Sequence, residues 1–188
     1  MPGDHEMSKE PVVQVGYNLE GVAFGMTDGV ICFLGIIIGV AQATQDLTLV
    51  LVAAVVGGVA DAMGNSFGFF ASQLTEQSVQ AHEQETHVEE VRVHSRREVW
   101  MSGVLAFVST MLALVILIVP FLIFSFQVAV ITTFLTGIAA LFALGMYVGK
   151  ISGKKEVKTG LVYAVLGVAG SLISYFVGSV LQSLTAIA

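Results

Sequence analysis

The chain consists of five long apolar runs separated by short polar links. The runs cover residues 20–43, 48–72, 99–121, 126–149 and 159–183. Each is longer than the about 20 mostly apolar residues that a helix needs to cross the hydrocarbon core of a bilayer. The runs are continuous and do not alternate, which favours α-helices over barrel strands. The pattern therefore predicts an all-α, polytopic membrane protein with five transmembrane helices.

Composition strengthens this prediction and excludes other classes of protein. Of the 188 residues, 55% are hydrophobic and 12% charged, and mean hydropathy is +0.86, whereas soluble domains carry about 25% charged residues. The net charge of −6 leaves no basic surface for a nucleic acid. Cys32 is the single cysteine, so no internal disulfide can form. The runs contain no nucleophile–base pair and no phosphate loop, so we expect neither an enzyme nor a prosthetic group.

The basic residues predict the orientation in the membrane. All eight Lys and Arg residues fall in the N-terminal tail 1–19, the link 73–98 and the link 150–158. Five spans place these three segments on one side, and basic loops stay in the cytoplasm. We therefore expect the N-terminus and both charged links to be cytoplasmic and the C-terminus to be outside.

Small residues recur at four-residue spacing along the runs. The rows are Gly21/Gly25/Gly29, Gly35/Gly39, Gly64/Gly68, Gly145/Gly149 and Gly170/Ser174/Gly178. Such rows let helices approach closely in lipid. They serve either packing within one bundle or a dimer seam, and the sequence leaves both open. Because an odd number of spans gives no obvious inverted repeat, a two-fold dimer would supply the symmetry around a shared pathway.

Two carboxylates, Asp28 and Asp61, lie well inside the predicted spans. A charge at the bilayer centre costs about 2.5–3.5 kcal/mol, so each needs a reason. Asp28 lies eight residues into the first span, about 12 Å deep, and Asn65 of the second span reaches nearly the same depth. Their oxygens suit hard or borderline divalent cations. Alternatively, Asp28, Asp61 and Asn65 only hydrogen-bond neighbouring helices.

The polar link 73–98 is expected to be a helical extension of the second span. Glu83, His87, Glu90 and His94 follow one another at steps of 4, 3 and 4 residues, which places them on one helical face. Carboxylates and imidazoles in this arrangement form a candidate site for Fe²⁺, Mn²⁺ or Zn²⁺. The alternative is a solvated charged helix with Glu–Arg pairs.

Two stretches carry a resemblance to a known family. GVAFGMTDGVICFLGIIIGVA at 21–41 and GGVADAMGNSFGFFASQLTE at 57–76 are similar to the first two helices of the vacuolar iron transporter family. The resemblance implies five membrane helices, a homodimer with a pathway at its two-fold axis, and proton-coupled export of Fe²⁺, often also Mn²⁺, from the cytosol. It also implies that Asp28 matches the family's pathway aspartate.

The second helix departs from the family's pattern. Aligned on the shared glycine, Asp61 stands where the family has a methionine ligand and Asn65 where it has a glutamate. We expect both to act as replacement ligands. The short extension between the second and third helices is typical of a compact prokaryotic branch, so a plasma membrane is the expected location.

Together these features predict a homodimeric divalent-metal exporter in the lipid bilayer. The ion would be collected in the cytoplasm by Glu83, His87, Glu90 and His94. It would pass a cytoplasmic mouth lined by Glu20 and Glu76 and would be held within the membrane by Asp28, Asp61 and Asn65. These nine residues are the predicted metal ligands. Two alternatives remain open: a transporter or channel for another cation, and a metal-sensing membrane assembly protein that transports nothing.

Overall fold

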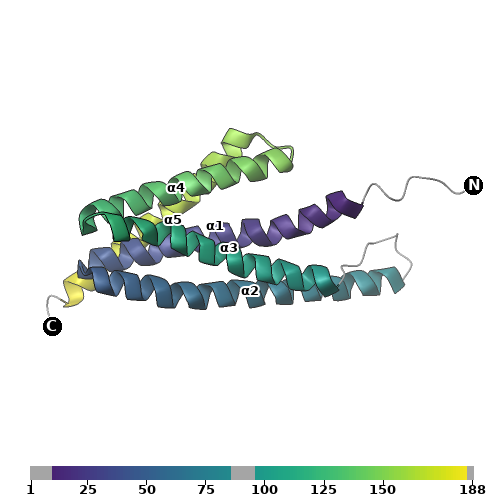
Figure 1. Ribbon diagram of the computed structural model, residues 1–188, viewed down its shortest axis with the longest axis horizontal. Coiled ribbons are helices and arrows are strands. Elements are labelled where there is room, and N and C mark those ends of the chain that lie inside the picture. The colour runs from purple at the N-terminus through teal and green to yellow at the C-terminus, as the bar shows by residue number, and fades with distance from the viewer. Residues whose placement is uncertain (1–9, 86–95, 186–188) are drawn as a thin grey trace, which may run out of the picture.

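The computed structural model describes residues 10–85 and 96–185, which form five α-helices (Figure 1). The helices are α1 (Glu10–Thr44), α2 (Leu47–Glu85), α3 (Arg96–Ile123), α4 (Phe126–Ile151) and α5 (Glu156–Thr185). Each contains a stretch long and apolar enough to cross a membrane. The described ranges hold no β-strand. The predicted all-helical membrane fold with five spans is thus confirmed.

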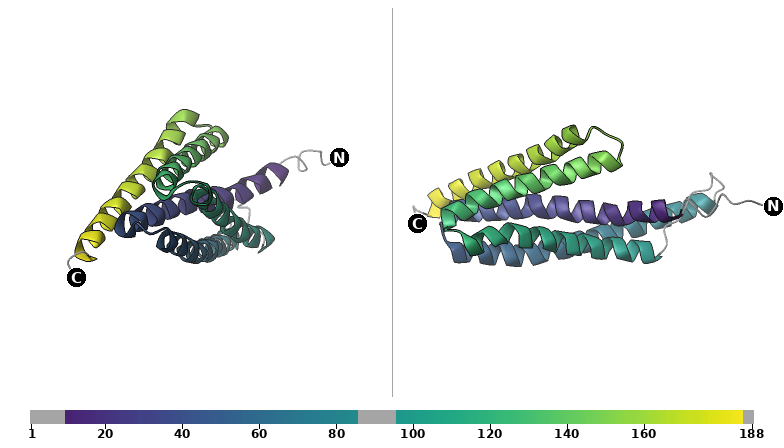
Figure 2. Two further views of the ribbon diagram at one scale, coloured as in Figure 1. Left: turned by 60° about the vertical axis from the view of Figure 1, so that its left-hand side comes forward. Right: turned by 45° about the horizontal axis from the view of Figure 1, so that its top comes forward.

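Helix α1 is the centre of the bundle. It packs against all four other helices, while α2 pairs with α3 and α4 pairs with α5 on opposite sides of it (Figure 2). The most deeply buried large side chains include Val30, Phe33, Leu34 and Ile37, all on α1. The central position of α1 places its polar residues between several helices, where they can meet partners.

The glycine row of α1 lets this helix approach α3. A Cβ atom added to Gly21 would lie 2.5 Å from the backbone oxygen of Ser102, and one on Gly25 would collide with the backbone oxygen of Ala106. In lipid, apolar side chains gain little by leaving the solvent, so close backbone contact is a main source of helix association. The row Gly21/Gly25/Gly29 therefore serves packing within the protomer.

Other glycine rows differ in what they meet. A Cβ on Gly35 would lie 2.9 Å from Ser174 Oγ of α5, so this part of α1 also packs within the protomer. Around Gly64 and Gly68 of α2 there is nothing within 4 Å. Met63 and Phe67, next to these glycines, are exposed. This face of α2 is left open by the single chain.

The helix ends extend beyond the apolar runs. Helix α1 begins at Glu10, and α2 continues to Glu85 through the first half of the polar link. The connection between these two helices is short, and its Asp46 caps α2: Oδ1 accepts hydrogen bonds from the N–H groups of Thr48 (2.7 Å) and Leu49 (3.1 Å). Such caps satisfy N–H groups that have no partner within the helix.

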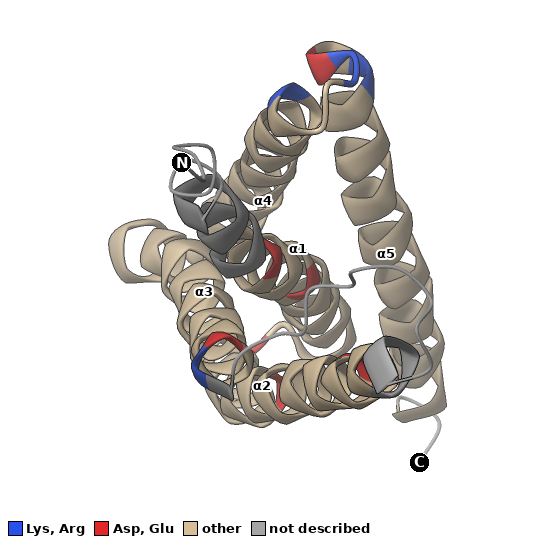
Figure 3. Cartoon of the chain, turned by 90° about the vertical axis from the view of Figure 1, so that its right-hand side faces the viewer, with Lys and Arg blue, Asp and Glu red and all other residues tan. Residues whose placement is uncertain are grey.

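The described basic residues gather at one end of the bundle, where α1 begins (Figure 3). They are Arg97, Lys150, Lys154, Lys155 and Lys158. Helix α5 ends at the opposite end (Figure 1). This is the charge separation that the sequence predicts for a protein with a cytoplasmic N-terminus, and we name this end the charged end.

Candidate functional site

A polar cluster lies where α1, α2 and α3 meet. The Nδ2 atom of Asn65 lies 2.9 Å from Asp28 Oδ2 and donates a hydrogen bond to it. The same nitrogen lies 3.3 Å from Asp61 Oδ2 and 3.4 Å from Thr110 Oγ1. The Cys32 side chain lies next to Asp61. We call Asp28, Cys32, Asp61, Asn65 and Thr110 the polar cluster.

Helix geometry brings these residues together in two pairs. Asp28 and Cys32 are one turn apart on α1, and Asp61 and Asn65 are one turn apart on α2, so each pair shares a face. The two faces contact each other, and Asp28 and Asn65 meet at one level of the bundle, as residue counting along the two spans predicts. The predicted proximity of Asp28, Asp61 and Asn65 is therefore observed. Their role as metal ligands stays a prediction.

Thr110 joins α3 to the cluster. Its hydroxyl is fully buried and lies within hydrogen-bonding distance of two backbone oxygens, Gly25 O at 3.0 Å and Ala106 O at 2.8 Å. Because Gly25 has no side chain, α3 can come close enough for Thr110 to reach its carbonyl. Thr110 thus fixes the nitrogen of Asn65 relative to α1.

The cluster holds two carboxylates without a nearby basic partner among the described residues. Arg97 is thirteen residues before Thr110 on α3, about 20 Å along the helix axis, and the described lysines lie at the charged end. The amide of Asn65 is therefore the donor that the two carboxylates share. Two carboxylates served by one neutral amide within a membrane favour a cation beside them.

The described residues contain no group of three or more His, Cys, Asp or Glu side chains placed to hold a metal ion. A cation at Asp28 and Asp61 would therefore need further oxygen ligands, and the amide of Asn65 and the hydroxyl of Thr110 are the nearest polar groups. Oxygen donors of this kind suit a hard or borderline divalent cation, whereas structural zinc sites favour thiolates and imidazoles.

The remaining predicted ligands lie elsewhere. Glu20 is exposed, eight residues before Asp28. Glu76 is exposed, eleven residues after Asn65, and accepts a hydrogen bond from Gln80 Nε2 at 3.1 Å. Both lie towards the charged end, along the helices that carry the cluster. His87, Glu90, His94 and the side chain of Glu83 lie outside the described residues.

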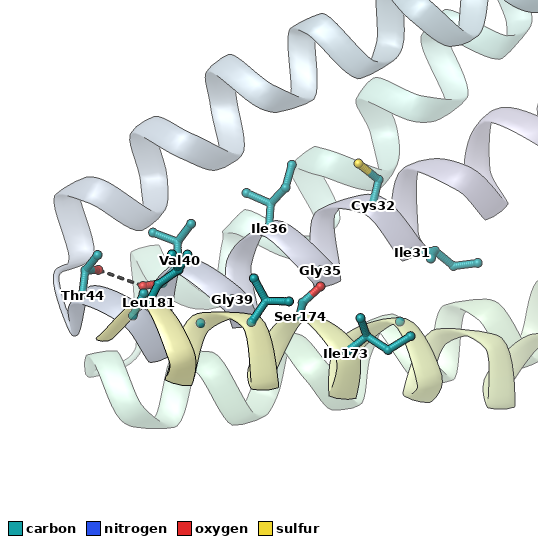
Figure 4. Close-up of a pocket in the computed structure, with 14 residues that line it drawn as sticks. Ile31, Cys32, Gly35, Ile36, Gly39, Val40, Thr44, Ile173, Ser174 and Leu181 are labelled. Carbon is teal, nitrogen blue, oxygen red and sulfur yellow. Dashed lines mark hydrogen bonds between the residues drawn. The ribbon is translucent and has the colours of Figure 1, made fainter. Parts of the chain in front are cut away.

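A groove adjoins the cluster at Cys32. It lies between α1 and α5, has a volume of about 720 Å³, and is lined mainly by small and aliphatic residues such as Gly35, Gly39 and Ile173 (Figure 4). It follows α1 from Cys32 to Thr44, at the end of the bundle opposite the charged end. Cys32 therefore belongs to both the polar cluster and this groove.

Sequence analysis did not identify Thr110 as part of the site. The available signal was the adjacent hydroxyl pair Ser109 and Thr110 in the middle of an otherwise apolar run. Intramembrane hydroxyls usually bond to their own helix, and Ser109 does so, donating to Leu105 O at 2.7 Å. The contact of Thr110 with Asn65 of α2 depends on how α2 and α3 pack together, which the sequence pattern does not show.

We expect Thr110→Val to loosen the cluster and lower stability by about 1 kcal/mol, because valine keeps the shape but leaves Gly25 O and Asn65 without this hydroxyl. Thermal unfolding of the purified protein in detergent measures this. Thr110→Ser, which keeps the hydroxyl, is the matched control and should retain most of the stability. A loss of stability in Thr110→Ser with none in Thr110→Val would show that the packing of the methyl group matters and the hydrogen bonds do not.

The fold and the cluster define a membrane protein with five spanning helices around an intramembrane carboxylate site. Residues 19–99 match the model of the VIT family, which is a family of membrane transporters. The match covers most of α1 and all of α2, the helices that supply both carboxylates and Asn65. The chain is also similar to an uncharacterized protein of Methanocaldococcus jannaschii, with 25% identity over 162 residues that cover 81% of this chain and 84% of that protein.

Proposed function

We propose that this protein exports a divalent metal ion, Fe²⁺ or Mn²⁺, from the cytosol in exchange for protons. The observation that carries the proposal is the contact of Asp28 and Asp61 with a single amide, on the two helices that match the VIT family. A cation in place of the amide nitrogen would reach both carboxylates.

Asn65 has a specific role in this proposal. Its NH₂ group holds the carboxylates in the absence of metal, at 2.9 Å from Asp28 and 3.3 Å from Asp61. Rotation of the side-chain amide by half a turn presents Oδ1 in place of the nitrogen. The same residue then changes from a donor that compensates two charges to a ligand that completes an oxygen site.

We place the ion path along α1 and α2, with its entrance at the charged end. Glu20 and Glu76 lie on that side of the cluster and would attract cations from the cytosol. Glu83, His87, Glu90 and His94 would collect the ion before it reaches them. Protonation of a cluster carboxylate would weaken the site and release the ion on the other side.

A homodimer would enclose this path. In one chain, the α2 face at Gly64 and Gly68 is open, and the groove between α1 and α5 is lined by small residues that permit close helix packing. Both surfaces flank the helices that carry the cluster. A second copy on these surfaces would cover them and place two clusters near the shared axis.

Metal flux into proteoliposomes tests the proposal. We expect uptake of Fe²⁺ and Mn²⁺ that increases when a pH gradient is applied, from protein whose mass in detergent is that of a dimer. Flux of another cation that Fe²⁺ and Mn²⁺ do not inhibit would favour the alternative of a transporter or channel for a different substrate. Absence of any flux from folded, oriented dimers would contradict transport and favour the metal-sensing alternative.

A further inference from the structure

The turn between α4 and α5 carries a concentration of positive charge that metal export does not use. Residues 150–158 include Lys150, Lys154, Lys155 and Lys158 against one carboxylate, Glu156, although the whole chain has a net charge of −6. All four lysines are exposed. The preference of basic loops for the cytoplasmic side accounts for lysines at this end of the spans. It does not require them to gather around one groove, so their arrangement needs a further explanation.

Three of these lysines line one groove. The groove has a volume of about 620 Å³, and its lining includes Lys154, Lys155 and Lys158 together with Val148, Val162 and Tyr163. No carboxylate belongs to this lining. Lys150 lies on the same turn but does not line the groove. The groove therefore combines a basic part with an apolar part.

The two parts are arranged along the membrane normal. The α4 span ends at Ile151 and the α5 span begins at Glu156, so the lysines lie at the level where the spans leave the membrane. Val162 is one helical turn deeper along α5 than Lys158. Tyr163 has the amphipathic ring that is typical of the membrane interface. The lysines at the membrane surface are complementary to the charged headgroup of a phospholipid, and the aliphatic groups one turn deeper are complementary to the start of its acyl chains.

The turn is held in a defined shape. The N–H of Lys154 donates to Gly149 O at 2.9 Å, the N–H of Ser152 donates to Val148 O at 3.0 Å, and Gly153 takes the left-handed conformation with φ of 65°. A Cβ on Gly149 would lie 3.0 Å from the Cα of Glu156, so the two helices approach closely there. The backbone that carries the lysines is thus fixed before any ligand arrives.

We propose that this groove binds the headgroup of an anionic phospholipid. The phosphate lies among Lys154, Lys155 and Lys158, and the upper part of the lipid chain lies against Val148 and Val162. Basic pockets between membrane helices are a known way of holding such headgroups. The proposal is independent of metal transport and of the polar cluster.

The experiment counts lipids bound to the purified full-length protein by native mass spectrometry. The probes are phosphatidylglycerol, phosphatidylcholine and free inorganic phosphate. We expect retention of phosphatidylglycerol over phosphatidylcholine, and about a fivefold weaker affinity for phosphatidylglycerol in Lys158→Gln. Lys150→Gln is the matched control, because this lysine has the same charge on the same turn but lies outside the lining; its affinity should be unchanged.

Each contrary outcome overturns the proposal. Equal weakening by Lys150→Gln and Lys158→Gln would mean diffuse attraction to the lipid surface without a site. Equal retention of the two lipids would remove the role of the phosphate charge. Displacement of phosphatidylglycerol by millimolar inorganic phosphate would identify a soluble anion as the ligand. Because these lysines are exposed, the thermal unfolding temperature should be the same in all variants without lipid.

Discussion

Asp28→Asn is expected to abolish metal transport while leaving the bundle and its assembly intact. The substitution keeps the size of the side chain, but it removes one of the two charges that would hold a divalent cation within the bilayer. Removal of one partner from a fully buried ion pair costs about 3–5 kcal/mol. Because Asp28 is part-buried, we expect the loss of its attraction to a bound cation to be at the lower end, about 3 kcal/mol or about a hundredfold in ion binding. Initial rates of Fe²⁺ and Mn²⁺ flux in proteoliposomes measure the effect.

Asp46→Asn is the matched control for this variant. Asp46 is an exposed aspartate that caps α2 outside the cluster, and asparagine caps a helix about as well as aspartate. Flux and stability should therefore equal those of the wild type. Wild-type flux from Asp28→Asn, at equal protein incorporation, would show that the ion does not pass Asp28 and would contradict the proposed pathway.

The five spans could be predicted from sequence because continuous apolar runs are a strong signal, whereas their exact ends could not. Helix α1 begins at Glu10, well before the first apolar run, whereas the continuation of α2 to Glu85 agrees with the helical extension expected for the link 73–98. A helix that projects from the membrane into water contains polar residues, so hydropathy falls at the membrane surface and not where the helix ends. The depth predicted for Asp28 and Asn65 does not depend on where the helices end, because it is counted from the ends of the apolar runs.

The partners of the cluster were only partly predictable. Counting along two antiparallel helices placed Asp28 and Asn65 at one depth, and the structure joins them at 2.9 Å. The contribution of α3 could not be found in this way, because a threonine in a membrane helix usually bonds to its own backbone. Thr110 does so and also contacts Asn65.

The glycine rows show why a spacing pattern in the sequence does not identify the helix that packs against it. The row at Gly21 and Gly25 and the row at Gly64 and Gly68 have the same four-residue spacing. In the structure the first is covered by α3 and the second by nothing within 4 Å. The four-residue spacing shows only that another helix can approach the glycines closely. Which helix of this chain or of a second chain packs there depends on how the helices are arranged around α1.

This contrast leads to the second large expected effect. Gly25→Ala should destabilise the protein by about 3 kcal/mol, at the upper end for overpacked cores. The new methyl group would collide with the backbone oxygen of Ala106, which cannot move away as a flexible side chain can, and would lie 2.9 Å from Thr110 Oγ1. Helices α1 and α3 would have to separate, and the hydrogen bond from Thr110 to Gly25 O would be lost.

Gly68→Ala provides the matched comparison in α2. The same methyl group meets nothing within 4 Å in the single chain, and alanine favours a helix over glycine by about 1 kcal/mol. Thermal unfolding in detergent should therefore show a large decrease for Gly25→Ala and none for Gly68→Ala. An unchanged unfolding temperature for Gly25→Ala would mean that α1 and α3 are not in close contact at this glycine. If Gly68→Ala leaves unfolding unchanged but lowers the fraction of dimer, then the open face of α2 is the surface that a second copy covers.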